Sequence, residues 1–158
     1  MILEQSEVWE GIESAFSKCQ KPHFFTDVSH CSECAEHNKT LSNSNRDTIG
    51  LKELGNPCWD PICFVNPKGF LYYFPAMVRL AFDNSTENEY LDQLLFHCCR
   101  EGRSSITYSH FSNEQVKATA DLMRFLTLNW KEKLDDHLLT EESEKALKIW
   151  EKLEKERM

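Results

Sequence analysis

NPKGFLYYFPAMVRLAF, residues 66–82, is the most apolar stretch of the chain and decides the fold that the sequence predicts. Asn66 is a good N-cap residue, and Pro67 falls at the first helical position, where its missing N–H is no loss. The residues that follow are apolar on nearly every side, so a helix formed by them must be buried by other helices. Pro75 removes one backbone hydrogen bond and should kink this helix. We therefore expect a buried, proline-kinked central helix.

Amphipathic segments on both sides of this stretch predict the helices that cover it. Apolar residues recur at helical spacing after Ser6, from Ser29 to Leu41, from Tyr90 to Cys98, from Val116 to Leu134 behind a capping box of Ser112 and Gln115, and after Thr140. Two further segments, 62–65 and 104–108, are rich in β-branched and aromatic residues and could pair as a minimal two-stranded element. The sequence thus predicts one mainly α domain, residues 1–158, with about six helices around residues 66–82.

Two segments are predicted to be less ordered. Residues 42–57 (SNSNRDTIGLKELGNP) are polar and rich in turn-forming residues, which favours a mobile loop. Leu51 and Leu54 predict one short helical turn within it. The C-terminal residues 154–158 are charged and are expected to form a frayed helix end.

Composition and charge exclude several classes of function. The formal net charge is −8 over 158 residues, and no basic stripe stands out, so we expect no binding to nucleic acid. The longest uncharged apolar run ends at Arg79 and is too short to cross a bilayer. The N-terminal residues show neither the basic nor the apolar region of an export signal. We therefore predict a cytoplasmic protein without a membrane segment, and the acidic surface suits a basic protein partner.

The sharpest local motif is HCSECAEH, residues 30–37. Its Cys-x-x-Cys allows three interpretations: two small apolar residues that pack in the core, a zinc site, or a redox pair. For zinc, the predicted ligands are His30, Cys31, Cys34 and His37, and helical spacing places His30, Cys34 and His37 on one side of the segment. Residues elsewhere that could complete such a set are Cys19, His23, Cys58, Cys63, His97, Cys98 and Cys99.

The sequence contains no motif of a known catalytic mechanism. There is no Gly-x-Ser-x-Gly and no glycine-rich phosphate loop, so we predict no catalytic residues. The preferred interpretation is a non-enzymatic, acidic protein-binding module, such as an immunity or inhibitor protein, with no cofactor. The alternatives are a zinc-binding protein that uses the second helix and a thiol-dependent enzyme.

Two motifs together resemble a bacterial family of small uncharacterised proteins, a domain of unknown function. One is the Cys-x-x-Cys with an adjoining acid, here Cys31, Glu33 and Cys34. The other is the aromatic block that runs into Pro75 and Ala76. This chain has Phe74 where the family usually has leucine, and His30 adjoins the first cysteine rather than standing apart from it. The resemblance covers roughly residues 5–130. It implies a bacterial or phage-borne cytoplasmic protein and brings no known activity with it.

Overall fold

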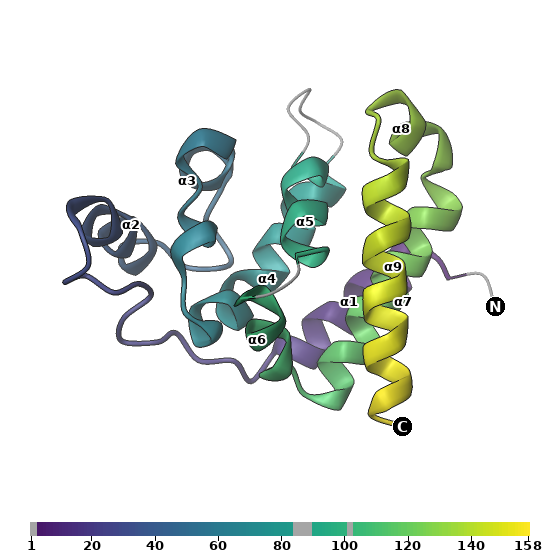
Figure 1. Cartoon of the computed structure of the whole chain (residues 1–158), viewed down its shortest axis with the longest axis horizontal. Coiled ribbons are helices and arrows are strands. Elements are labelled where there is room, and N and C mark those ends of the chain that lie inside the picture. The colour runs from purple at the N-terminus through teal and green to yellow at the C-terminus, as the bar shows by residue number, and fades with distance from the viewer. Residues whose placement is uncertain (1–2, 84–89, 101–102) are drawn as a thin grey trace.

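Helix α4 (Pro67–Phe82) lies at the centre of the computed structural model, which describes residues 3–83, 90–100 and 103–158 (Figure 1). The helix begins where the sequence predicts, because Asn66 Oδ1 accepts a hydrogen bond of 2.8 Å from the Gly69 N–H. Tyr73, Phe74 and Met77 are fully buried. The helix continues through Pro75, and the kink there stays a prediction.

The long helices α7 (Asn113–Asn129) and α9 (Thr140–Glu156) pack together beside α1 (Gln5–Phe16) and form the other half of the core. Helix α7 packs against both α1 and α9, and α1 also packs on α4 (Figure 1). Helix α5 (Leu91–Cys98) contacts α4 and α9, and α6 (Arg103–Ser109) contacts α4. The predicted mainly α fold is confirmed. In the described part of the chain, six helices have eight residues or more, as the sequence suggested.

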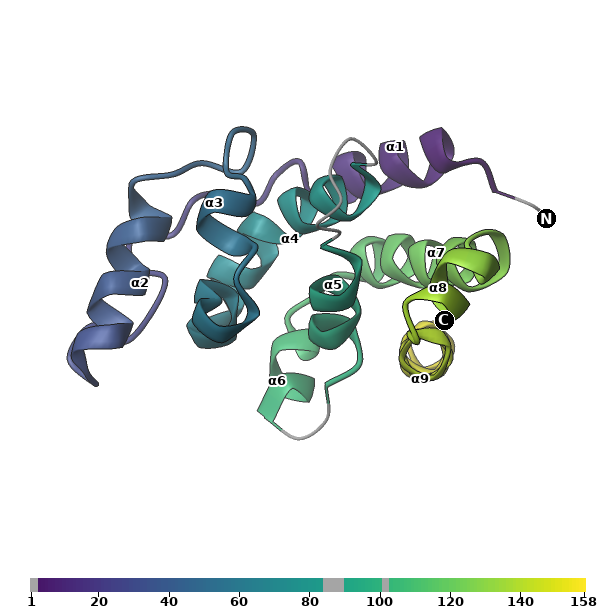
Figure 2. The same ribbon diagram turned by 90° about the horizontal axis from the view of Figure 1, so that it is seen from above.

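The segment between α1 and α4 forms one end of an elongated molecule. It contains α2 (Ser32–Ser42), the short α3 (Leu51–Leu54) and two 3₁₀ turns, η1 (Pro57–Trp59) and η2 (Pro61–Phe64). Helix α2 packs on η2. Both views place α2 far from α9, at the opposite end (Figures 1 and 2).

The expected two-stranded element is wrong. Residues 62–64 belong to η2, residues 104–108 belong to α6, and the described residues contain no strand. Asp60 Oδ1 accepts a hydrogen bond of 2.9 Å from the Ile62 N–H, and Pro61 follows Asp60, so this segment is capped as a turn rather than extended.

Some predicted helix boundaries also differ. Glu4, and not Ser6, is the N-cap of α1, with its N–H donating to Glu7 Oε2 at 2.9 Å. The long helix predicted to reach Leu134 is interrupted at Trp130, and α8 (Lys131–Asp136) follows as a separate turn. The Trp130 ring packs against Phe82 and Phe125, contacts that spacing alone does not reveal.

Residues 42–57 are fastened to the core at several points. Tyr73 Oη donates to the Leu41 carbonyl at 2.5 Å, just before this segment. Arg79 donates to the carbonyls of Arg46 and Ile49 at 3.0 and 2.7 Å, and Arg46 donates to the Phe16 carbonyl at 2.9 Å. The predicted helical turn within the segment is α3. The mobility of the segment stays a prediction.

The C-terminal residues are likewise in contact with the core. Helix α9 extends to Glu156, and the Arg157 guanidinium donates to the carbonyls of Phe111 and Tyr108. The fraying of residues 154–158 stays a prediction.

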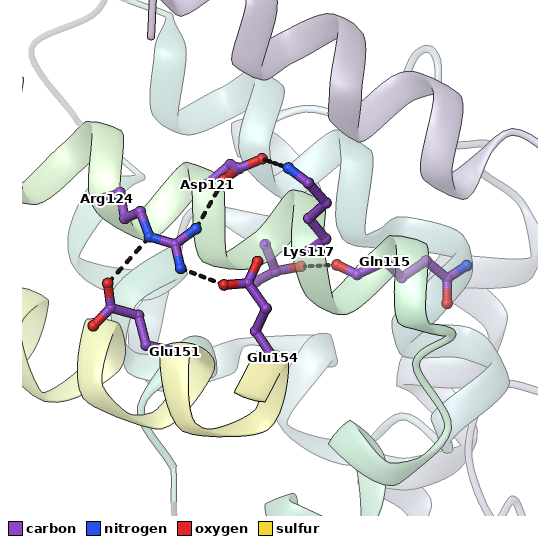
Figure 3. Close-up of polar contacts among 7 residues, drawn as sticks. Gln115, Lys117, Asp121, Arg124, Glu151 and Glu154 are labelled. Carbon is purple, nitrogen blue, oxygen red and sulfur yellow. Dashed lines mark hydrogen bonds and ion pairs between the residues drawn. The ribbon is translucent and has the colours of Figure 1, made fainter. Parts of the chain in front are cut away.

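An ion-pair network joins α7 to α9 (Figure 3). The Arg124 guanidinium donates to Asp121 Oδ1 at 2.9 Å on its own helix, to Glu151 Oε1 at 3.1 Å, and to Glu154 Oε1. These carboxylates, Glu154 above all, raise the pKa of Arg124. The network therefore links α7 to α9, and its charged groups are paired with one another.

No helix in the described ranges is long and apolar enough to span a bilayer.

Candidate functional site: a cleft lined by cysteine and histidine

The first turn of α2 places the two sulfurs of the Cys-x-x-Cys. Helix α2 begins at Ser32, three residues later than predicted, with Cys31 as its N-cap. Asp27 is the reason: its Oδ1 accepts hydrogen bonds from the Ser29 N–H at 3.1 Å and from Ser29 Oγ at 2.7 Å, which holds a separate turn before the helix. As N-cap, Cys31 accepts a hydrogen bond of 3.4 Å at its Sγ from the Cys34 N–H.

Three donor atoms converge at this end of α2. Cys31 Sγ lies 3.4 Å from Cys34 Sγ, which lies 3.6 Å from His30 Nδ1, and all three donors lie within 4.8 Å of one another. A tetrahedral zinc ion with ordinary Zn–S and Zn–N bonds has ligand-to-ligand separations of about 3.5–3.8 Å. The donor group therefore fits a zinc ion with only small movements.

His37, the fourth predicted ligand, lies outside this group. Its ring is fully buried and packs against Trp59 and Phe64, with centroid separations of 4.7 and 4.9 Å. Its Nε2 lies 3.3 Å from Glu33 Oε1. His37 therefore joins α2 to η1 and η2, and the donor group holds three of the four predicted residues.

The two cysteines differ in exposure and acidity. Cys31 is exposed, so the interpretation that it packs in the core is wrong, whereas Cys34 is buried. The Cys34 N–H, followed by His30, lowers the pKa of Cys31 to about 7. The pKa of Cys34 is raised, first by its hydrogen bond with Cys31. Cys31 is thus the sulfur that becomes a thiolate near neutral pH.

A second group of titratable side chains lies across α5 and η2. Asp60 Oδ2 accepts hydrogen bonds from His97 Nε2 at 2.8 Å and from Gln93 Nε2 at 3.1 Å, and Cys63 Sγ is close to both Asp60 and His97. Burial raises the pKa of Cys63, and the nearby Asp60 adds to this. The separation of 2.8 Å is that of a hydrogen bond and is shorter than the edge of a metal coordination sphere. This group is therefore a buried hydrogen-bonded centre.

Sequence reasoning missed this second group. Cys63 and His97 were named only as residues that could complete a zinc set, and Asp60 was not singled out. The one local signal is Asp60-Pro61, a pair suited to cap a turn. His97 is thirty-seven positions away from Asp60, so only the fold brings them together.

Members of both groups line one cleft: His30 and Cys34 of the first, and Cys63 and His97 of the second. Its volume is about 540 Å³, and it lies between the start of α2, the η2–α4 junction, and α5 with α6. Its lining includes both polar and apolar side chains: Asp27, His30, Cys34, Ile62, Cys63, Phe64, Val65, Pro67, Phe70, His97, Arg100, Ile106, Thr107 and Tyr108.

The remaining candidate ligands are not brought to the Cys-x-x-Cys. Cys98 is buried in the core, and Cys19 Sγ accepts a hydrogen bond from Gln115 Nε2 at 3.3 Å. Neither they nor His23, Cys58 and Cys99 belong to the donor groups found among the described residues.

Comparison of the chain with family models, curated proteins and solved structures gives no match. The family resemblance and the basic protein partner therefore stay hypotheses.

Proposed function

We propose that the protein binds one zinc ion through His30 Nδ1, Cys31 Sγ and Cys34 Sγ, with the fourth coordination position open to the cleft. The observation that carries this proposal is the convergence of the three donors: Cys34 Sγ lies 3.4 Å from Cys31 Sγ and 3.6 Å from His30 Nδ1. A sulfur that becomes a thiolate near pH 7 favours metal binding at neutral pH.

The donor chemistry favours zinc over the common hard cations. Two thiolates and an imidazole suit a borderline-soft ion, whereas magnesium and calcium take oxygen ligands. Three protein ligands with one open position are typical of zinc sites that bind a further molecule, while closed structural sites use four. Zinc in this position would act as a Lewis acid toward a molecule in the cleft.

The test is the zinc content of reduced protein after dialysis, measured by elemental analysis. We expect about one zinc per chain for the wild type and strong loss of binding for Cys31→Ser and for His30→Ala. Cys58→Ser and His23→Ala are matched controls, because both residues are exposed and lie outside the donor group. Zinc content near zero in the wild type, or equal loss in the controls, contradicts the proposal.

A redox pair is the second candidate. The observation that favours it is an exposed Cys31 whose sulfur lies 3.4 Å from that of the buried Cys34. An exposed attacking sulfur beside a shielded resolving sulfur suits thiol–disulfide exchange. Equilibration in glutathione buffers of graded potential, followed by mass spectrometry of the 31–34 peptide, tests this. A disulfide that forms only under conditions more oxidising than the glutathione pool excludes it.

The protein-binding role that the sequence favoured is supported by the net charge of −8. Exposed aromatic side chains on the α2 side, Phe24, Trp59 and Phe64, add apolar surface to it. Capture of a basic protein that is lost in high salt supports this role, and its persistence in high salt argues against a charge-based partner.

A further inference from the structure

We propose that the cleft binds a small organic carboxylate, whose negative group is held by Arg100, which follows α5, whereas His30 and Cys34 line the cleft from the start of α2. A donor atom at the other end of the molecule takes the open position of the zinc ion, and this second contact rests on the proposed function.

The Arg100 guanidinium has an aromatic neighbour but no hydrogen-bond acceptor among the described residues. It lies over the ring of Phe96, with the Cζ atom 5.1 Å from the ring centre. Within the described ranges, no carbonyl or carboxylate accepts a hydrogen bond from this guanidinium; its backbone N–H donates to Tyr108 Oη at 3.3 Å.

The guanidinium groups of four other arginines all have acceptors. Arg46, Arg79 and Arg157 donate to backbone carbonyls, and Arg124 donates to three carboxylates. In a chain of net charge −8, carboxylates are plentiful, so a half-buried guanidinium that has none among the described residues is a candidate site for an external anion. The planar guanidinium can donate two parallel hydrogen bonds to a carboxylate.

The walls of the cleft limit the size and shape of the ligand. A volume of about 540 Å³ lies within the range of sites for small molecules. Ile62, Phe70 and Ile106 give the cleft an apolar lining beside its polar and charged side chains. A ligand with a short apolar body and one anionic end fits these walls, whereas a polyanion is repelled by the charge of the whole protein.

The orientation of the ligand follows from charge. Asp27 lines the cleft at the His30 end, and hydrogen bonds from Ser29 hold its carboxylate in the ionised form. A ligand carboxylate is repelled there and attracted by Arg100. The end that faces the zinc ion is therefore the other one, and a thiol is the group that zinc binds most readily.

The experiment is titration calorimetry with three matched probes. 3-Mercaptopropionate has both groups, butyrate has only the carboxylate, and 3-mercapto-1-propanol has only the thiol. For the zinc-loaded protein, we expect 3-mercaptopropionate to bind most tightly and each single-group probe to bind about tenfold or more weakly. Arg100→Gln should lower the affinity for 3-mercaptopropionate and for butyrate about tenfold and leave the affinity for 3-mercapto-1-propanol unchanged. Lys148→Gln, which removes one exposed charge elsewhere, is the control and should change nothing.

The metal-free protein separates the two proposals. If Arg100→Gln weakens butyrate binding there as well, the carboxylate site stands whether or not zinc binds. If zinc binds but 3-mercaptopropionate binds no better than 3-mercapto-1-propanol, or Arg100→Gln has no effect in a variant that circular dichroism shows to be folded, the inference is overturned while the zinc proposal survives.

Discussion

A single backbone hydrogen bond distinguishes the two sulfurs of the donor group. The Cys34 N–H points at Cys31 Sγ because Cys31 is the N-cap of α2, and this bond is the largest of the effects that lower the pKa of Cys31 to about 7. The same position would hold a proton-free sulfur for a metal ion or for attack on a disulfide. The reactivity of Cys31 is therefore a direct check on the local geometry.

In reduced, metal-free protein, we expect the alkylation rate of Cys31 to reach half its maximum near pH 7. A lowered pKa means that the thiolate is present above this pH and is lost below it. An ordinary cysteine has its midpoint near about 8.5. His30→Ala should move the midpoint upward, because His30 is the second cause of the shift. Mass spectrometry of pulse-labelled peptides measures each site, and a Cys31 midpoint equal to that of free cysteine contradicts the N-cap geometry.

Asp60 joins η2 to α5 through the hydrogen bonds of its side chain. It is 4% exposed and accepts hydrogen bonds from Ile62, Gln93 and His97. Asp60→Ala leaves the Ile62 N–H and His97 Nε2 buried without an acceptor, whereas Gln93 keeps its bond to the Leu54 carbonyl, so we expect the free energy of unfolding to fall by about 3 kcal/mol or more. Urea denaturation measures this, and Asp136→Ala, at an exposed position, is the control. A loss no larger than that of the control would show that the centre is not a structural one.

Sequence could predict donors that are neighbours along the chain and could not predict those joined by the fold. His30, Cys31 and Cys34 lie within five positions, so their convergence depends on one local turn. His37 was assigned to the same group because the helix was expected to begin at Ser29. Its true contacts, Trp59 and Phe64, lie more than twenty positions away, and no spacing rule reports them.

At the scale of elements, the helices whose starts the sequence predicts correctly include two that carry their own capping residues. Helix α4 has Asn66 before Pro67, and α7 has the reciprocal bonds of Ser112 and Gln115, 3.1 and 2.8 Å long. Residues 104–108 have β-branched and aromatic residues, yet they form α6, which packs on α4. There, tertiary packing overrides a weak intrinsic preference.

The Arg124 network allows a test of how α7 and α9 are held together (Figure 3). Arg124→Ala removes three charge-assisted contacts that are only partly exposed, so we expect a loss of about 1 kcal/mol in the free energy of unfolding. The loss should shrink in high salt, because these charges are partly accessible to screening. Lys152→Ala is the control, since its pair with Glu156 is exposed and 3.9 Å long. Equal effects for both variants would contradict the role of the network.

At the scale of the whole molecule, stability should be unevenly distributed. Helix α7 is packed between α1 and α9, while α2 packs chiefly on η2 at the far end (Figure 2). Local opening is governed by the packing of each unit, so α2 and the turns around it should open at a lower free energy than α7. The candidate ligands lie at this less stable end, and binding there can therefore order it.

Hydrogen exchange can test both the lower stability of α2 and the binding of zinc at its start. In metal-free protein, we expect the amides of residues 34–42 to exchange faster than those of α7. Zinc at a hundred times its dissociation constant should slow exchange of the α2 amides up to about a hundredfold, because only the closed form brings the three donors together. The exchange rates of the α7 and α9 amides should change much less, since α2 can open without them.

Two variants serve as controls for this effect. Cys31→Ser should abolish the effect of zinc and Cys58→Ser should preserve it. Uniform slowing across all helices would mean that zinc stabilises the fold as a single unit, and no slowing in α2 would mean that the metal binds elsewhere or not at all.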